Sequence, residues 1–350
     1  MNWFNNLDTA TLFVIFSVVK VICVFSVVMA MVAYSVLAER RIAAFIQDRL
    51  GPNRVGPAGI FQPVADGVKS FLKEDFTPGH VRKIYFWLAP MITMIPALLV
   101  LAVIPFGSIL GAQKMVIADL NVGILYTFGI VSLGVYGIVL AGYASNSKYP
   151  FLGGIRASAQ MISYEIAMGL SVIPIFLIVG DLNLSQVIEH QALHGWLIFY
   201  APISFIIFII SAFAETNRMP FDLPESEQEL VGGYNTEYSS MKFALFFMGE
   251  YANMIAASAM MVTLFLGGWT LPFAGLDNPN PTSMLVGVAQ IGIFLGKIIV
   301  LMGLCIWVRW MWPRFRYDQL MDLGWRKLLP LSLLNIVATA LWLWAIGGKH

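Results

Sequence analysis

The sequence has few charged residues and little cysteine. Only 12% of its 350 residues are Asp, Glu, Lys or Arg, about half of the ~25% in a soluble domain, which excludes a soluble enzyme and a disordered chain. The two cysteines, Cys23 and Cys305, lie in apolar runs outside any CxxC pattern. We therefore expect no disulfide framework, and no metal or iron–sulfur site held by this chain alone. The 21 basic and 20 acidic residues nearly cancel, so no basic field for nucleic acid exists.

Long apolar runs dominate the sequence, with 59% hydrophobic residues and a mean hydropathy of +0.77. A run of about 20 apolar residues crosses a hydrocarbon core about 30 Å thick. We predict an all-α polytopic membrane protein, a single membrane domain over 1–350 with about eight transmembrane helices. The expected spans are 11–38, 84–106, 121–144, 161–180, 196–214, 243–268, 284–308 and 328–347. The first run lacks the basic flank and A-x-A-like site of a cleaved leader, so we expect it to remain as a helix.

The distribution of basic residues predicts the orientation. Four connections carry 17 of the 21 Lys and Arg residues: 39–83, 145–160, 215–242 and 309–327. The opposite side carries two, Lys114 and Lys349. Basic loops stay in the cytoplasm, so these four are expected to be functional cytoplasmic loops, with both termini on the non-cytoplasmic side.

The first of these loops contains an amphipathic pattern. Phe61, Val64 and Val68 recur at helical spacing, with Asp66 and Lys69 between them. A short helix with one apolar and one charged face is typical of a segment lying in the membrane interface.

Two glutamates, Glu165 and Glu250, fall inside expected spans. An ionised group near the bilayer centre costs roughly 3 kcal/mol, so such residues usually face protein or water. Small or polar residues share their helical faces, Gly169 with Glu165 and Asn253 with Glu250. The pattern favours a proton relay, and interhelical hydrogen bonding is the alternative.

The loop 215–242 has a formal charge of −4, although it lies on the basic side. Glu225, Glu227 and Glu229 alternate and would share one face of an extended segment. Crowding would raise the pKa of some of these carboxyls toward neutrality, as a proton store requires. A solvated acidic loop is the alternative interpretation.

Lys20 and Lys297 lie in the middle of expected spans. Each could neutralise an intramembrane acid or join a proton path; snorkelling is the alternative. None of the four histidines falls in a span, which disfavours haem held between the helices. His190 and His194 have i,i+4 spacing without a zincin motif, and no Walker loop or dinucleotide fingerprint occurs.

Three segments carry a family resemblance. They are AERR at 38–41 followed by QDRLGPNRVGP at 47–57 and GIFQPVADGVKSFLKE at 59–74, GGIRASAQMISYE at 153–165, and AETNRMPFDLPESEQEL at 214–230. With the eight-span layout, they resemble the quinone-module membrane subunit (the H subunit) of NADH-quinone oxidoreductase, respiratory complex I.

The resemblance implies the membrane subunit of an H⁺-translocating NADH:quinone reductase that couples quinone reduction to proton pumping. Quinone, such as ubiquinone, would be the substrate, and this chain would bind no cofactor alone. The expected partners are peripheral subunits carrying FMN and iron–sulfur clusters, including the terminal cluster, small membrane subunits leading to antiporter-like subunits, and lipid. The implied location is the bacterial inner membrane, as a multi-pass protein.

The resemblance also implies roles for individual residues. Those expected at the quinone chamber and its mouth are Glu39, Arg40, Arg49, Asp66, Phe61, Val64 and Val68. Those expected in the proton path are Glu165, Glu215 and Glu250, and the acidic coupling loop would contain Asp222, Glu225, Glu227 and Glu229. Unlike some relatives, the chain has no acid between Asp119 and Glu165.

Three other classes of protein are alternatives. The membrane anchor of an energy-converting hydrogenase shares the intramembrane acids, but the complete segment from Arg49 to Pro57 favours complex I. A stand-alone ion transporter would show inverted repeats or paired broken helices. A purely structural anchor would not need Glu165 and Glu250.

Overall fold

The computed structural model describes residues 9–110, 113–223, 232–272, 278–279, 283–345 and 347. The long helices are α1 (Thr9–Ile46), α3 (Lys83–Val100), α4 (Gly123–Ala144), α5 (Lys148–Val179), α8 (Pro202–Glu215), α10 (Ser240–Phe265), α11 (Met284–Met311) and α13 (Leu329–Ala345). Shorter helices are α2 (Gln62–Leu72), α6 (Leu184–His194), α7 (Leu197–Tyr200), α12 (Tyr317–Asp322), the 3₁₀ turns η2 (Pro57–Gly59) and η3 (Gly233–Asn235), and the π-helical turn η4 (Leu323–Leu328). Strands β1 (Ile109–Leu110) and β2 (Gln113–Lys114) pair antiparallel.

The chain is an all-α polytopic membrane protein. Lipid offers no hydrogen-bond partner to a backbone, so apolar segments of this length fold as helices. Among the described residues, seven helices are long and apolar enough to cross a membrane, with α12, η4 and α13 counting as one. The expected span 196–214 corresponds to α7 and the 14-residue helix α8, so the total of eight spans stays a prediction.

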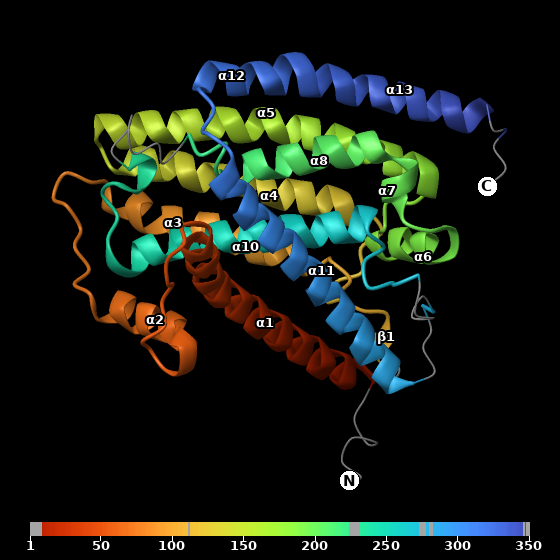
Figure 1. Cartoon of the computed structure of the whole chain (residues 1–350), viewed down its shortest axis with the longest axis horizontal. Helices are drawn as coiled ribbons and strands as arrows, with labels where there is room; N and C mark the ends of the chain where they lie inside the picture. The colour runs from red at the N-terminus through yellow and green to blue at the C-terminus, as the bar shows by residue number, and fades with distance from the viewer. Residues whose placement is uncertain are drawn as a thin grey trace, which may run out of the picture.

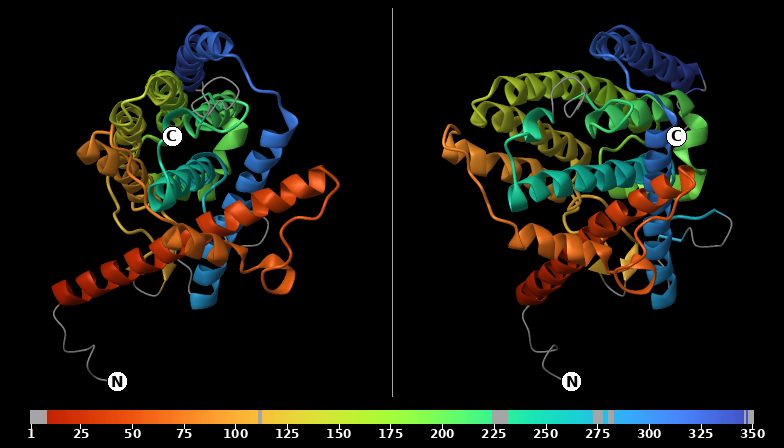
Figure 2. Two further views of the ribbon diagram at one scale, coloured as in Figure 1. Left: turned by 90° about the vertical axis from the view of Figure 1, so that its left-hand side faces the viewer. Right: turned by 60° about the vertical axis from the view of Figure 1, so that its left-hand side comes forward.

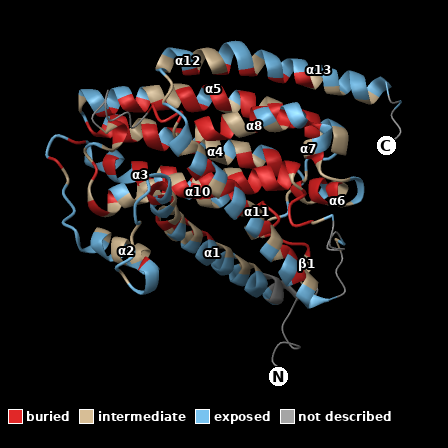
Figure 3. Cartoon of the chain, viewed as in Figure 1, coloured by how far each residue is buried: buried red, intermediate tan, exposed pale blue. Residues whose placement is uncertain are grey.

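Helices α3, α4, α5, α8 and α10 lie alongside one another as a bundle (Figure 1). Helices α1 and α11 cross one side of this bundle, and α13 lies along the outside of α5 (Figures 1 and 2). Close packing depends on small residues: a Cβ on Gly142 of α4 would stand 2.6 Å from the Pro150 carbonyl oxygen of α5. Buried residues concentrate on α10, whereas α1 and α13 are largely exposed (Figure 3).

Two helices extend beyond the expected spans. Helix α1 continues to Ile46, so Glu39 lies within it, and α5 begins at Lys148, not near 161. The early start of α5 is stabilised by Gln160, a buried residue whose amide donates to the carbonyl oxygens of Ala214 (2.6 Å) and Phe221 (2.8 Å). A polar residue with satisfied hydrogen bonds can lie inside a packed helix, and hydropathy alone does not show this.

The two intramembrane lysines contact backbone carbonyls. The Lys297 ammonium donates to the carbonyl oxygens of Leu266, Gly268 and Thr270 at 2.6, 2.9 and 2.6 Å. These carbonyls follow the end of α10, where a helix leaves acceptors without intrahelical donors. Lys20 donates at 2.7 Å to the carbonyl oxygen of Lys114, in β2. Both contacts favour a structural role in fixing loops to helices.

Candidate functional site

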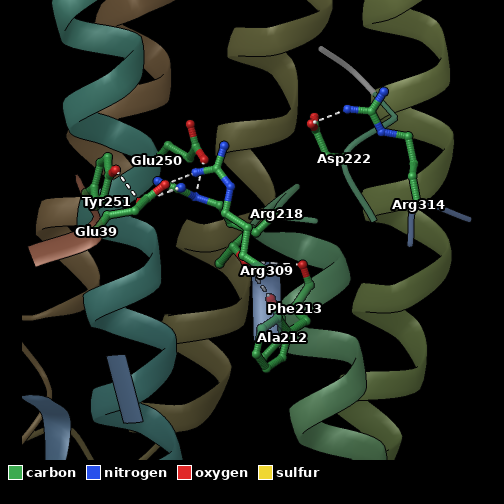
Figure 4. A network of polar contacts seen from close by, with 10 residues as sticks. Glu39, Ala212, Phe213, Arg218, Asp222, Glu250, Tyr251, Arg309 and Arg314 are labelled. Atoms are coloured by element: carbon green, nitrogen blue, oxygen red, sulfur yellow. Dashed lines mark hydrogen bonds and ion pairs between the residues drawn. The ribbon is translucent and has the colours of Figure 1, made fainter. Parts of the chain in front are cut away.

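A buried arginine lies between two carboxylates from different helices. Arg218 follows α8 and is 5% exposed. Its Nη1 is 2.9 Å from Oε2 of Glu39 on α1, and its Nε is 2.5 Å from Oε1 of Glu250 on α10 (Figure 4). Three segments far apart in the sequence therefore meet through charged groups.

Two further residues complete this charged cluster, which consists of Glu39, Arg218, Glu250, Tyr251 and Arg309. Arg309 of α11 forms an ion pair with Glu39. The Tyr251 hydroxyl donates to Glu39 Oε2 at 2.5 Å, and the Arg218 guanidinium lies 4.3 Å from the centre of the Tyr251 ring. Two carboxylates face two guanidinium groups, so the cluster is formally neutral and can be buried without an unbalanced charge.

The protonation state of Arg218 is fixed by its neighbours. Burial lowers the pKa of the Arg218 guanidinium, but the charges of Glu250 and Glu39 raise it more, and the net shift is upward. Arg218 is therefore a permanent cation. A proton that arrives in this cluster must be held by a carboxylate, because the arginine has none to release.

Two small cavities adjoin Glu250. The first, of about 20 Å³, is lined by Glu250, Glu215 and Asn253, among others. The second, of about 40 Å³, is lined by Glu215, Asn253 and apolar side chains of α4, α5 and α10. One water needs roughly 10–15 Å³ measured in this way, so the first cavity has room for about one water and the second for two or three. Glu250 thus contacts Arg218 and also borders space for water.

The three glutamates expected in a proton path lie on three different helices. Glu215 is the last residue of α8 and borders both cavities. Glu250 borders the first cavity, and its helix α10 also carries Asn253. Glu165 is half-buried on α5, and its charge acts on Glu215. The fold brings the three helices together around the two cavities.

The residues expected at a quinone chamber divide into two groups. Arg40 follows Glu39 on α1 but points to the surface, where its Nη1 is 2.7 Å from Oδ2 of Asp66 on α2. The Gln62 amide also donates to Asp66, at 3.1 Å. Arg49 instead contacts Gln47 at 2.8 Å in an exposed turn. Arg40, Asp66 and Glu39 therefore lie together at one end of α1, and the contact recorded for Arg49 is within its own turn.

The expected interfacial helix is confirmed as a helix, α2. Phe61, Val64 and Val68 are 54%, 61% and 50% exposed, so the apolar face of α2 is not covered by this chain. Of the acidic loop, Asp222 is described: it is buried and lies 3.0 Å from Nη2 of Arg314. Glu225, Glu227 and Glu229 lie outside the described residues.

Sequence reasoning missed the partners of the glutamates. Arg218 entered the sequence argument only as one of two bases in an acidic loop, and Tyr251 and Arg309 carried no prediction. A weak signal existed: Tyr251 directly follows Glu250, and Arg309 is the first charge after a long apolar run. No sequence pattern indicates that both meet Glu39, which is 212 residues away from Tyr251 and 270 from Arg309.

Comparison with known proteins places this geometry in a family. The family model described as NADH dehydrogenase matches residues 19–340. Subunit 8 of NADH-quinone oxidoreductase from Rhodothermus marinus is 52% identical over 314 residues, covering 87% of this chain and 91% of that protein. The H subunit of the same enzyme from Paramagnetospirillum magneticum is 50% identical over 330 residues, covering 94% and 93%. The first of the H subunits numbered in Cytophaga hutchinsonii is 47% identical over 334 residues, covering 93% and 96%.

Proposed function

The chain belongs to the family of NADH-quinone oxidoreductase H subunits, and from this premise we propose that it forms part of a quinone chamber and the first part of a proton path. The redox groups, FMN and iron–sulfur clusters, belong to partner subunits, and quinone is the substrate. The chain crosses a bacterial inner membrane eight times with both termini on the non-cytoplasmic side, as its 17 basic residues in four loops indicate.

The observation that carries this proposal is the position of Arg218 between Glu39 and Glu250. At one end, Glu39 is adjacent in sequence to Arg40, whose partner Asp66 lies on the interfacial helix. At the other end, Glu250 borders the cavities that also contact Glu215. The charged cluster therefore connects the surface proposed for quinone with the interior proposed for protons.

The mechanism follows from charge balance. Reduction of a quinone takes up two electrons and two protons, and the chemistry itself belongs to the quinone and the clusters. A change of charge near Arg40 and Asp66 alters the potential at Glu39, and Arg218 is shared between Glu39 and Glu250. When Arg218 is drawn toward Glu39, Glu250 loses part of its counter-charge and gains affinity for a proton.

Protons then move by way of water and carboxylates. Glu250 exchanges a proton with water in the first cavity, and Glu215 lies on the boundary of both cavities. The charge of Glu165 disfavours a second negative charge on Glu215, so these two acids exchange protons in sequence. Asp222, paired with Arg314 at 3.0 Å, links this region to the acidic loop.

The test is to replace Glu250 or Glu165 by glutamine in the assembled complex. Both variants should lose proton pumping and the coupled quinone reduction, because a glutamine cannot carry a proton along the path. NADH oxidation with an artificial acceptor should stay unchanged, since that reaction bypasses this subunit. Asp318→Asn, in an exposed surface pair with Arg316, is the matched control. Wild-type pumping in both glutamine variants would remove these glutamates from the path.

A further inference from the structure

A large apolar cleft lies away from the charged cluster, between α1, α10 and α11. Its volume is about 440 Å³, within the range of ligand pockets, roughly 300–1,000 Å³. Of the twenty described residues that line it, Lys20 and Gln113 are the polar ones. Small side chains such as Val28 and Ala259 form part of its wall and leave room for an occupant.

The polar groups of the cleft belong to one region of it. Gln113 is in β2, and the Lys20 ammonium donates to the carbonyl oxygens of Lys114 (2.7 Å) and Val116 (3.4 Å), which flank the same hairpin. From Lys20, the lining residues of α1 continue to Met31. Eleven residues of helix measure about 17 Å, and one leaflet of the hydrocarbon core is about 15 Å thick.

We propose that this cleft binds one acyl chain of a phospholipid from the leaflet on the side of the β1–β2 hairpin, with the phosphate against the Lys20 ammonium. The apolar walls fit the chain, and the cation at one end fits the phosphate in charge. The length of the cleft fits one leaflet. The candidate quinone residue Arg40 lies about 30 Å along α1 from Lys20, and a neutral quinone headgroup has no charge for Lys20 to pair with.

The native cysteines supply a probe. Cys23 is exposed and lines the cleft, whereas Cys305 is buried elsewhere on α11. In the purified complex, stripped of lipid in detergent, Cys23 should react with a maleimide. Reconstitution in nanodiscs of phosphatidylglycerol should slow that reaction about tenfold, and native mass spectrometry should detect one retained phospholipid.

Two variants test the occupant. Val27→Trp places an indole in the cleft and should abolish retention of the phospholipid. Val18→Trp, at an exposed α1 position that does not line the cleft, should retain it. Lys20→Gln should weaken retention about tenfold, since a charge-assisted contact with the phosphate is lost.

Two results would overturn the proposal: equal lipid retention by Val27→Trp and wild type, or protection of Cys23 by ubiquinone in detergent but not by phosphatidylglycerol. Quinone reduction is measured separately on each sample. Failure of the lipid site therefore leaves the proposed proton path untouched, and the reverse also holds.

Discussion

Replacing Arg218 by methionine removes the cation between Glu39 and Glu250 while keeping an unbranched side chain. The Arg218 side chain is 6% exposed, and those of Glu39 and Glu250 are 10% and 16% exposed. Removing one member of a buried ion pair costs about 3–5 kcal/mol, because the remaining charge has no compensation. Arg309 and Tyr251 still contact Glu39, so we take the lower limit, about 3 kcal/mol.

That free energy sets the expected loss of function. A cost of about 3 kcal/mol reduces the population of the doubly ionised arrangement roughly a hundredfold. We therefore expect proton pumping, and the quinone reduction coupled to it, to fall to roughly a hundredth of wild type. Arg218→Lys should be intermediate, since one ammonium cannot match the forked geometry that reaches both carboxylates.

The assay is NADH-driven quinone reduction together with acidification of inverted membrane vesicles. Native gel electrophoresis establishes that the complex is assembled, and NADH oxidation with an artificial acceptor reports on the peripheral subunits. Arg316→Met, at an exposed pair with Asp318, is the matched control and should behave as wild type. An assembled Arg218→Met complex that pumps at the wild-type rate would refute the reasoning, since Arg218 would then serve only to hold the helices together.

Two further predictions concern other parts of the chain. Arg40→Ala and Asp66→Asn, which break the 2.7 Å pair between α1 and α2, should each lower quinone reduction while leaving oxidation of NADH by an artificial acceptor intact; undiminished quinone reduction in both variants would exclude them from the chamber. Lys297→Met should lower the thermal inactivation temperature of the complex, because carbonyls at the end of α10 lose a charged donor worth about 1.5–3 kcal/mol. The ratio of protons pumped to electrons transferred should stay unchanged in Lys297→Met, and a changed ratio would place Lys297 in the proton path instead.

The helical membrane fold follows from composition alone. A run such as 11–38 has no alternative to a helix in lipid, because only a helix satisfies its own backbone hydrogen bonds. The interfacial helix α2 was equally predictable, since the spacing of Val64 and Val68 is set by the 3.6-residue period. Ends of helices were less predictable. Helix α5 begins at Lys148 because Gln160 finds carbonyl partners on α8 and beyond, and such partners are tertiary.

The sequence also identified Glu165 and Glu250 as unusual, since an acid in an apolar run is costly wherever the run folds. It did not identify what neutralises Glu250. The partner is Arg218, which local sequence places in an acidic loop, and the fold carries it into the interior between α1 and α10. Hydropathy and charge spacing report on a residue and its neighbours within a few turns. The pairing of Glu39 with Arg309, 270 residues apart, depends on how whole helices cross, and only the tertiary structure decides that.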